Sequence, residues 1–240
     1  MGILEEHAAI VTGGGTGIGR GVALKLGQAG AHVLICGRRE EPLREAEATI
    51  RGAGGIVNVV VADVSTEQGA ADVVGAAYNA YGAIDILVNN AGVFRGGQIH
   101  DHDVAAWDEA MAANLRAPFL MARAVLPIMR KQDRGYVINV SSESGIEHYE
   151  GNGAYGVSKH GLNALSEYIQ RENQEHGVRV ATICPGMVAT PMTDGLEGLD
   201  TRKCLFPEDI ADLVYYLVTR RRNVKIGTPL LIQTMVNPWG

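Results

Sequence analysis

Residues 8–19 of this chain read Ala-Ala-Ile-Val-Thr-Gly-Gly-Gly-Thr-Gly-Ile-Gly, a short apolar, β-branched run that ends in a glycine-rich turn. A helix-compatible segment follows, over residues 17–29. Glycine lets a backbone turn sharply and approach a pyrophosphate, and a helix N-terminus offers free N–H groups and a positive dipole to that anion. The stretch therefore predicts a strand, a turn and a helix that bind a dinucleotide. A glycine-rich turn without a cofactor is the alternative, because Gly13, Gly17 and Gly19 are spaced as GxxxGxG rather than GxGxxG.

Short apolar runs alternate with helix-compatible segments along the rest of the chain. Runs that are apolar throughout suit strands buried on both faces of a parallel sheet. The pattern predicts a single-domain α/β protein over residues 1–240, with a doubly wound Rossmann-type parallel sheet and helices on both faces. The expected strands are Ala8–Thr12, His32–Cys36, Ile56–Ala62, Ile84–Asn89, Tyr136–Val140, Arg179–Cys184 and Pro229–Gln233. The expected helices are 17–29, 40–53, 66–81, 103–131, 154–176 and 207–219.

Three local features refine this prediction. Ser65, with Gln68 three residues later, has the pattern of a helix N-cap, and Asp103 precedes another apolar-periodic run. The stretch 186–206 is a long irregular connection, which predicts a substrate lid. Its apolar residues indicate either an apolar substrate or a lid that packs on its own core.

Composition excludes several classes of function. The 240 residues are 46% hydrophobic with a net charge of −6, which suits one large core and argues against a nucleic-acid or anionic-membrane partner. Three scattered cysteines form no disulfide framework, and no apolar run is long enough to span a membrane. We therefore expect a soluble protein of the cytoplasm. His100-Asp101-His102-Asp103 is interpreted as a polar loop, so no metal site is expected.

The segment Tyr155-Gly156-Val157-Ser158-Lys159 carries the candidate chemistry. On a helix, Tyr155 and Lys159 lie one turn apart on the same face. An ammonium that close stabilises phenolate and is expected to lower the tyrosine pKa, which would make Tyr155 a usable proton donor and acceptor. An exposed helical pair is the alternative interpretation of these two residues alone.

The end of the second expected strand bears on the choice of cofactor. NAD-selective sites carry an acid there, which accepts hydrogen bonds from the ribose hydroxyls. This chain has Gly37, Arg38 and Arg39 instead, and a guanidinium matches a 2′-phosphate. The pattern favours NADP(H) over NAD(H), unless both arginines point to solvent.

Together these motifs resemble the short-chain dehydrogenase/reductase family over roughly residues 7 to 219. Thr12–Gly19 is similar to the cofactor turn, Asp63-Val64 to the segment that holds the adenine, and Asn89-Asn90-Ala91-Gly92 to the segment that steadies the sheet. Pro185-Gly186 resembles the turn beside the nicotinamide. The four catalytic positions of the family are matched by Asn114, Ser142, Tyr155 and Lys159.

The resemblance implies a role for each matched residue. Tyr155 would exchange a proton with a carbonyl or alcohol oxygen, Ser142 would hydrogen-bond that oxygen, and Lys159 would contact the nicotinamide ribose. Asn114 would hold a water that links Lys159 to solvent. The cofactor would be bound by Gly13, Thr16, Gly17, Ile18, Gly19, Arg38, Arg39, Asp63, Val64, Asn90, Ala91, Gly92, Tyr155, Lys159, Pro185, Gly186, Val188 and Thr190.

The expected function is hydride transfer between NADP(H) and a ketone or secondary alcohol, in the carbonyl-reductase direction and on an apolar small molecule. An NAD-dependent alcohol dehydrogenase and a dinucleotide sensor without turnover are the alternatives. Relatives commonly pair through helices at 103–131 and 154–176, which implies a homodimer or homotetramer. The tail Thr234–Gly240 departs from the family pattern. Trp239 is expected to pack against a neighbouring subunit, to close the substrate pocket, or to be buried on the surface of its own subunit.

Overall fold

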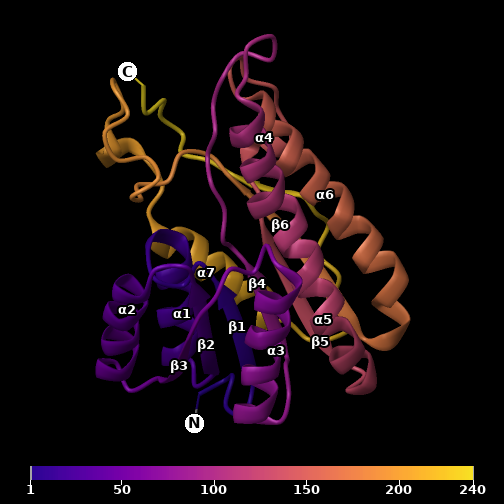
Figure 1. The fold of residues 1–240 in the computed structure, drawn as a ribbon. Coiled ribbons are helices and arrows are strands. Elements are labelled where there is room, and N and C mark those ends of the chain that lie inside the picture. Colours follow the sequence, from indigo (N-terminus) through magenta and orange to yellow (C-terminus); the bar gives the residue numbers. More distant parts are fainter. Residues whose placement is uncertain (1, 240) are drawn as a thin grey trace.

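The computed structural model describes residues 2–239, and within them a seven-stranded parallel sheet has the order β3-β2-β1-β4-β5-β6-β7. The chain crosses from β1 outward to β3 and then returns past β1 to β4, so the sheet is doubly wound, as predicted (Figure 1). The strands are β1 (Ala8–Thr12), β2 (His32–Gly37), β3 (Ile56–Val61), β4 (Ile86–Asn89), β5 (Gly135–Val140), β6 (Val178–Pro185) and β7 (Leu230–Ile232).

Helices cover both faces of this sheet. The helices are α1 (Gly17–Gln28), α2 (Glu40–Gly52), α3 (Glu67–Tyr81), α4 (Val104–Met111), α5 (Ala117–Lys131), α6 (Gly153–Asn173) and α7 (Pro207–Val218). The helices α1, α2 and α7 pack on one face, while α3, α5 and α6 pack on the other. No helix in residues 2–239 is long and apolar enough to cross a membrane.

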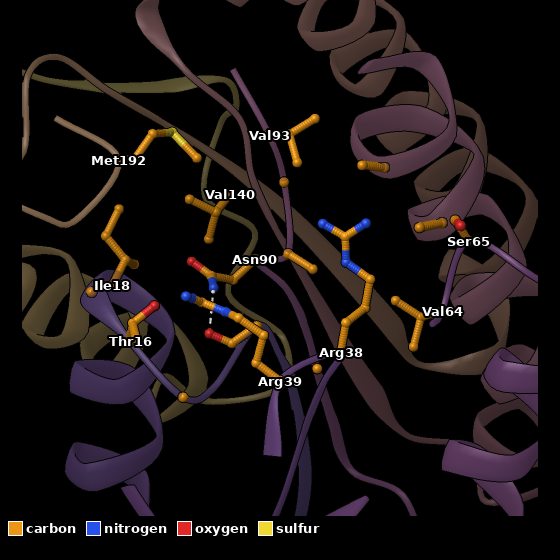
Figure 2. A pocket seen from close by; sticks show the side chains of 18 of the residues that line it. Thr16, Ile18, Arg38, Arg39, Val64, Ser65, Asn90, Val93, Val140 and Met192 are labelled. Carbon is orange, nitrogen blue, oxygen red and sulfur yellow. Dashed lines mark hydrogen bonds between the residues drawn. The ribbon is translucent and has the colours of Figure 1, made fainter. Parts of the chain in front are cut away.

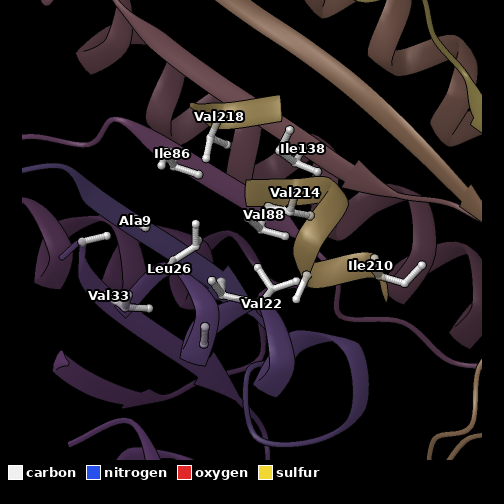
Figure 3. Close-up of a cluster of buried hydrophobic side chains, with 14 of the residues drawn as sticks. Ala9, Val22, Leu26, Val33, Ile86, Val88, Ile138, Ile210, Val214 and Val218 are labelled. Carbon is white, nitrogen blue, oxygen red and sulfur yellow. The ribbon is translucent and has the colours of Figure 1, made fainter. Parts of the chain in front are cut away.

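Alternate residues of each strand enter opposite cores because side chains along a strand point alternately to the two faces. In β1, Ala9 and Val11 lie in one buried cluster, and Ile10 lies in the other. Figure 3 shows the first cluster, where Val22 from α1 and Val214 from α7 meet the central strands. Both faces of the central strands are thus sealed, which leaves the carboxyl ends of the strands as the open edge.

Two predicted details of the helices are wrong. The expected helix 103–131 is interrupted by a π-helical turn, Ala112–Arg116, between α4 and α5. Ser65 is not the N-cap of α3; that position is held by Thr66, whose hydroxyl accepts a hydrogen bond from the Gly69 amide. The Ser65 hydroxyl instead donates to the carboxylate of Asp63 at 2.7 Å. The predicted cap Asp103 is confirmed, since its carboxylate accepts from the Ala106 amide.

Two irregular segments stand above the carboxyl ends of the strands. The connection 186–206 contains one short 3₁₀ turn, Thr201–Lys203, and returns to itself through a bridge between Val188 and Leu205. The C-terminal tail lies beside this connection, where the Asp200 amide donates to the Pro238 carbonyl oxygen (Figure 1). Trp239 is 49% exposed, so its ring is only half covered within its own chain.

Candidate active site

A cavity of about 410 Å³ opens along the carboxyl ends of β1, β2, β4 and β5. Figure 2 shows side chains from several of these strands and their loops converging on it. This is the crevice where ligands bind in open α/β sheets. Fourteen residues predicted to bind the cofactor line it: Gly13, Thr16, Gly17, Ile18, Arg38, Arg39, Asp63, Val64, Asn90, Ala91, Gly92, Tyr155, Lys159 and Thr190.

The glycine-rich turn shapes the cavity floor. Gly17 has a φ of +51°, a backbone conformation that favours glycine. A methyl group at Gly19 would collide with the carbonyl oxygen of Gly13, so α1 can approach the turn this closely only with glycine at that position. Thr16, the N-cap of α1, makes no side-chain cap hydrogen bond, and the first turn carries no acid. The first N–H groups of α1 therefore remain available to an anion, which fits the pyrophosphate of a dinucleotide.

Two amide side chains hold the turn and the central strands in register. The Asn90 side chain donates to the carbonyl oxygens of Thr12 at 3.0 Å and Gly13 at 3.3 Å. Next to it, the buried Asn89 side chain donates to Asn139 Oδ1 at 2.8 Å, which ties β4 to β5. These bonds fix the backbone on either side of the cavity.

Arg38 and Arg39 extend from the end of β2 over the cavity (Figure 2). Arg38 Nη1 lies 3.9 Å from Glu109 Oε1, a carboxylate that also receives Arg95 at 2.6 Å. A hydrogen bond from Ser65 is the main cause of a lowered pKa at Asp63, and the charge of Arg38 contributes. This end of the cavity therefore carries cationic groups. The two carboxylates near Arg38 already have other partners, since Glu109 pairs with Arg95 and Asp63 accepts from Ser65.

Lys159 lies at the opposite end of the cavity, on the first turns of α6. Its ammonium nitrogen donates to the Val140 carbonyl oxygen at 2.9 Å and lies 5.6 Å from the centroid of the Tyr155 ring. The predicted juxtaposition of Tyr155 and Lys159 is thus present. Burial lowers the pKa of Lys159 from 10.5 to about 8, because a desolvated ammonium is disfavoured.

The predicted direction of the Tyr155 pKa is wrong. Burial raises the pKa of Tyr155 above its ordinary value of 10, because desolvation disfavours phenolate. A side-chain hydrogen bond with Ser142 opposes this rise, whereas the charge of Glu143 adds to it. Lys159 is not among the groups that lower the pKa of Tyr155, so the ammonium one turn away does not offset the effect of burial.

Ser142 follows β5 and faces the tyrosine. Its hydroxyl oxygen accepts from the Ser144 amide at 3.1 Å, which orients the side chain at the start of a short 3₁₀ turn, and it forms the side-chain hydrogen bond with Tyr155. The neighbouring Ser141 hydroxyl donates instead to the Lys159 main-chain carbonyl at 3.3 Å. Ser141, and not Ser142, is among the residues that line the cavity, so the choice of Ser142 as the residue that meets the substrate stays a prediction.

Asn114 occupies the π-helical turn and is fully buried. Its side-chain oxygen accepts from the Val93 amide at 2.8 Å, and its nitrogen donates to the Val93 carbonyl and the Ser158 hydroxyl. The side chain is therefore engaged by Val93 and Ser158, and the role of Asn114 in holding a water that links Lys159 to solvent stays a prediction. What the side chain does hold is the segment after β4, directly beside the cavity.

Four predicted cofactor residues do not line the cavity. Gly19 lies beneath the turn, and Val188 is buried in the connection after β6. Pro185 ends β6, and the Gly186 amide donates to the Ile232 carbonyl oxygen at 2.9 Å. These residues support the site from behind or from the side of the lid.

The sequence interpretation missed three residues at the site. Phe94 packs edge-on against Tyr155, with ring centroids 5.3 Å apart. Glu109 holds Arg38 and Arg95, although nothing in its helical context distinguishes it from a solvent-facing acid. Glu143 directly follows Ser142, so its position alone was a usable signal. Within residues 2–239, no group of three or more His, Cys, Asp or Glu side chains is arranged to hold a metal ion.

The family model of short chain dehydrogenase matches residues 7–198. The chain belongs to this family. Among relatives of this short-chain dehydrogenase, an uncharacterized oxidoreductase of Staphylococcus epidermidis is 36% identical over 227 residues, which cover 95% of this chain and 97% of the relative. The protein is accordingly an oxidoreductase that acts on CH–OH and C=O groups and uses a nicotinamide dinucleotide.

Two solved structures are similar to this short-chain dehydrogenase over most of its length. A metagenomic short-chain oxidoreductase in complex with NADP is 37% identical, covers 95% of this chain and 97% of its own, and has a TM-score of 0.83. A variant of actinorhodin polyketide ketoreductase with NADPH is 29% identical, covers 91% of this chain and 92% of its own, and has a TM-score of 0.84. The fold and the family predicted from the motifs are confirmed.

Proposed function

We propose that this short-chain dehydrogenase reduces ketones to secondary alcohols with NADPH. The observation that carries the proposal is the pair formed by Tyr155 and Lys159 at one end of the dinucleotide cavity, where the ammonium lies 5.6 Å from the centroid of the tyrosine ring and Ser142 is near enough to the phenol to lower its pKa. A phenol, a hydroxyl and an ammonium grouped in this way can donate a proton to a carbonyl oxygen and hold that oxygen while it does so.

The contacts suggest a role for each residue of the site. The cofactor, when bound, supplies the hydride to the carbonyl carbon. Ser142 donates a hydrogen bond to the carbonyl oxygen, and Tyr155 transfers its proton to the same oxygen. The raised pKa of Tyr155 keeps the phenol protonated at neutral pH, which suits the reductive direction. Lys159 donates to the Val140 carbonyl oxygen and lines the cavity, where its ammonium would hydrogen-bond the ribose of a bound cofactor.

The preference for NADP(H) rests on Arg38 and Arg39. Both line the cavity, and positions 37–39 contain no carboxylate to repel a 2′-phosphate. Glu109 lies near Arg38, but its charge is already neutralised by Arg95 at 2.6 Å. The two similar structures that contain NADP and NADPH add support.

A substrate with an apolar body suits the surface above the site. Phe94, Met192, Leu196 and Phe206 are each at least 39% exposed around the mouth of the cavity and along the 186–206 connection, which we assign as the lid. Exposed apolar side chains gain by covering an apolar ligand. We further assign residues 1–240 to one domain and the protein to the cytoplasm, where its three free cysteines stay reduced.

A homodimer or homotetramer is part of the same proposal. The side chains of Phe119, Val157 and Tyr168 on α5 and α6 are about half exposed or more, which gives these helices an unburied apolar face. Light scattering coupled to size-exclusion chromatography tests the assignment, and a monomer at micromolar concentration contradicts it.

The function is tested by following oxidation of NADPH and NADH with a panel of ketones. Tyr155→Phe removes only the hydroxyl and is expected to abolish turnover while cofactor binding persists. Tyr78→Phe, on α3 and 43% exposed, is the matched control and should retain full activity. Equal efficiency with NADH favours the NAD-linked dehydrogenase, and tight NADPH binding without turnover of any ketone favours the sensor.

A further inference from the structure

A carboxylate stands next to the proposed proton donor. Glu143 directly follows Ser142, begins the short 3₁₀ turn Glu143–Gly145 and is partly exposed. Its charge is one cause of the raised pKa of Tyr155, so the carboxylate is close enough to act on the phenol. Nothing in the proposed ketone reduction uses it.

The contacts of Glu143 place its carboxylate between the tail after β7 and the turn after β6. Its Oε2 accepts a hydrogen bond of 2.7 Å from Gln233, in the tail after β7. A methyl group at Gly186 would lie 3.1 Å from the same oxygen, so the absence of a side chain at Gly186 leaves room for the carboxylate. Burial is the main cause of a raised pKa at Tyr149, and the charge of the nearby Glu143 carboxylate adds to it. Three separate segments thus meet around one carboxylate.

All of these partners are neutral. Within residues 2–239, no lysine, arginine or histidine nitrogen lies within 4.0 Å of the Glu143 carboxylate. Lys159, whose ammonium lies 5.6 Å from the Tyr155 ring, instead donates to Val140. Neutral donors orient the carboxylate, but they leave its charge uncompensated. A partly buried anion in this position attracts a cationic ligand, because desolvation strengthens the charge-assisted bond.

We propose that the ketone substrate carries a protonated amine, which forms an ion pair with Glu143 while the carbonyl oxygen meets Ser142 and Tyr155. The proposal deepens the proposed function and rests on it. A two-point attachment of this kind fixes the carbonyl relative to the proton donor, since the ammonium and the carbonyl oxygen are held by adjacent residues. The apolar body of the substrate lies against Phe94 and the lid.

The competing role for Glu143 is structural: its carboxylate could serve only to hold Gln233 and the tail. Glu143→Gln distinguishes the two roles, because it preserves size and a hydrogen-bonding group while it removes the charge. Glu147→Gln is the matched control, since Glu147 is exposed on the same loop and its loss changes the net charge equally.

The experiment measures kcat/KM with NADPH for matched ketones at a pH where the amines are protonated. One pair is aminoacetone and butanone, and the other is para-(aminomethyl)acetophenone and para-ethylacetophenone. The ratio of the charged to the neutral member is compared within each enzyme, so that a general loss of activity cancels. We expect the wild type and Glu147→Gln to favour the ammonium member of at least one pair by about tenfold or more, and Glu143→Gln to lose that preference.

Each outcome separates the two proposals. Turnover of the neutral ketones without any preference for the amines overturns the role of Glu143 and leaves the reductase intact. An unchanged ratio in Glu143→Gln does the same. Hydroxyacetone reduced as efficiently as aminoacetone shows that a neutral donor suffices, which also overturns the cationic class. No turnover of any ketone by the wild type removes the proposed reductase itself, and the amine substrate with it.

Discussion

The ammonium nitrogen of Lys159 donates a hydrogen bond of 2.9 Å to the carbonyl oxygen of Val140, although the lysine is only 4% exposed. Burial lowers the pKa of Lys159 to about 8. The folded protein therefore bears a cost, about 3 kcal/mol, for a charge that the unfolded chain keeps in water.

Lys159→Met should make the protein more stable and inactive. At pH 7 the lysine is charged in both states, so its removal relieves the desolvation cost, and we expect a gain of about 1–3 kcal/mol in the free energy of unfolding. Between pH 8 and about pH 10.5 the unfolded chain binds a proton that the folded wild type has lost, so wild-type stability rises with pH and the gain shrinks. Urea unfolding at pH 7 and pH 10 measures both effects, and a variant less stable than wild type at pH 7 contradicts them.

Ser142→Ala and Glu143→Gln should move the pH profile of alcohol oxidation in opposite directions. Oxidation needs the Tyr155 phenolate, so its rate rises with pH through the tyrosine pKa. The hydrogen bond from Ser142 lowers that pKa and the charge of Glu143 raises it. The inflection should therefore shift to higher pH in Ser142→Ala and to lower pH in Glu143→Gln. Steady-state rates with NADP⁺ and a secondary alcohol provide the profile; shifts of the same sign in both variants would refute this account.

Arg38→Ala should weaken NADPH binding more than NADH binding. Loss of one charge-assisted contact to a 2′-phosphate costs about 1.5–3 kcal/mol, or about 10- to 100-fold in affinity. Fluorescence titration of both cofactors measures the difference, and Arg39→Ala identifies which guanidinium matters more. An equal loss of affinity for both cofactors would show that Arg38 supports the cavity but does not bind the 2′-phosphate.

Gly19→Ala should abolish dinucleotide binding. The added methyl group collides with the Gly13 carbonyl oxygen and the Asn90 amide, so α1 must move away from the turn. Overpacking of this kind costs about 1–3 kcal/mol of stability. Gly75→Ala on α3 is the control, because no atom lies within 4 Å of the methyl position there. NADPH titration and urea unfolding should show a loss of affinity and of stability in Gly19→Ala only, because Gly75→Ala lies inside α3 and is expected to gain about 0.5–1 kcal/mol. Normal NADPH affinity in Gly19→Ala is the contrary result.

The order of strands and helices was predictable from local pattern. The buried run of β1 begins and ends at the residues expected, Ala8 and Thr12, because continuous apolar runs between helical segments are strong signals. The cap of α3 was not, because both hydroxyls donate to Asp63 and only that of Thr66 also accepts from the Gly69 amide, a difference that the sequence pattern does not show. Nor does a helical period reveal where the π-helical turn at 112–116 falls.

The candidate site was predictable as a set of residues but not as an electrostatic environment. The spacing of Tyr155 and Lys159 fixes their proximity on α6. The direction of their pKa shifts depends on burial, which comes from distant chain segments and is not encoded in the spacing. The hydrogen-bond partner of Glu143 is likewise distant in the sequence, because Gln233 lies 90 residues further along the chain.

The bond between Glu143 and Gln233 has a consequence for engineering. Residues 143 and 233 belong to segments that a designer would ordinarily vary separately, one as a catalytic loop and the other as a dispensable terminus. A chimera that imports the last strand and tail of a relative brings a foreign side chain to the carboxylate of Glu143, next to Ser142. Libraries that alter substrate choice should therefore randomise positions 143 and 233 together, and grafts should exchange the two segments as a unit.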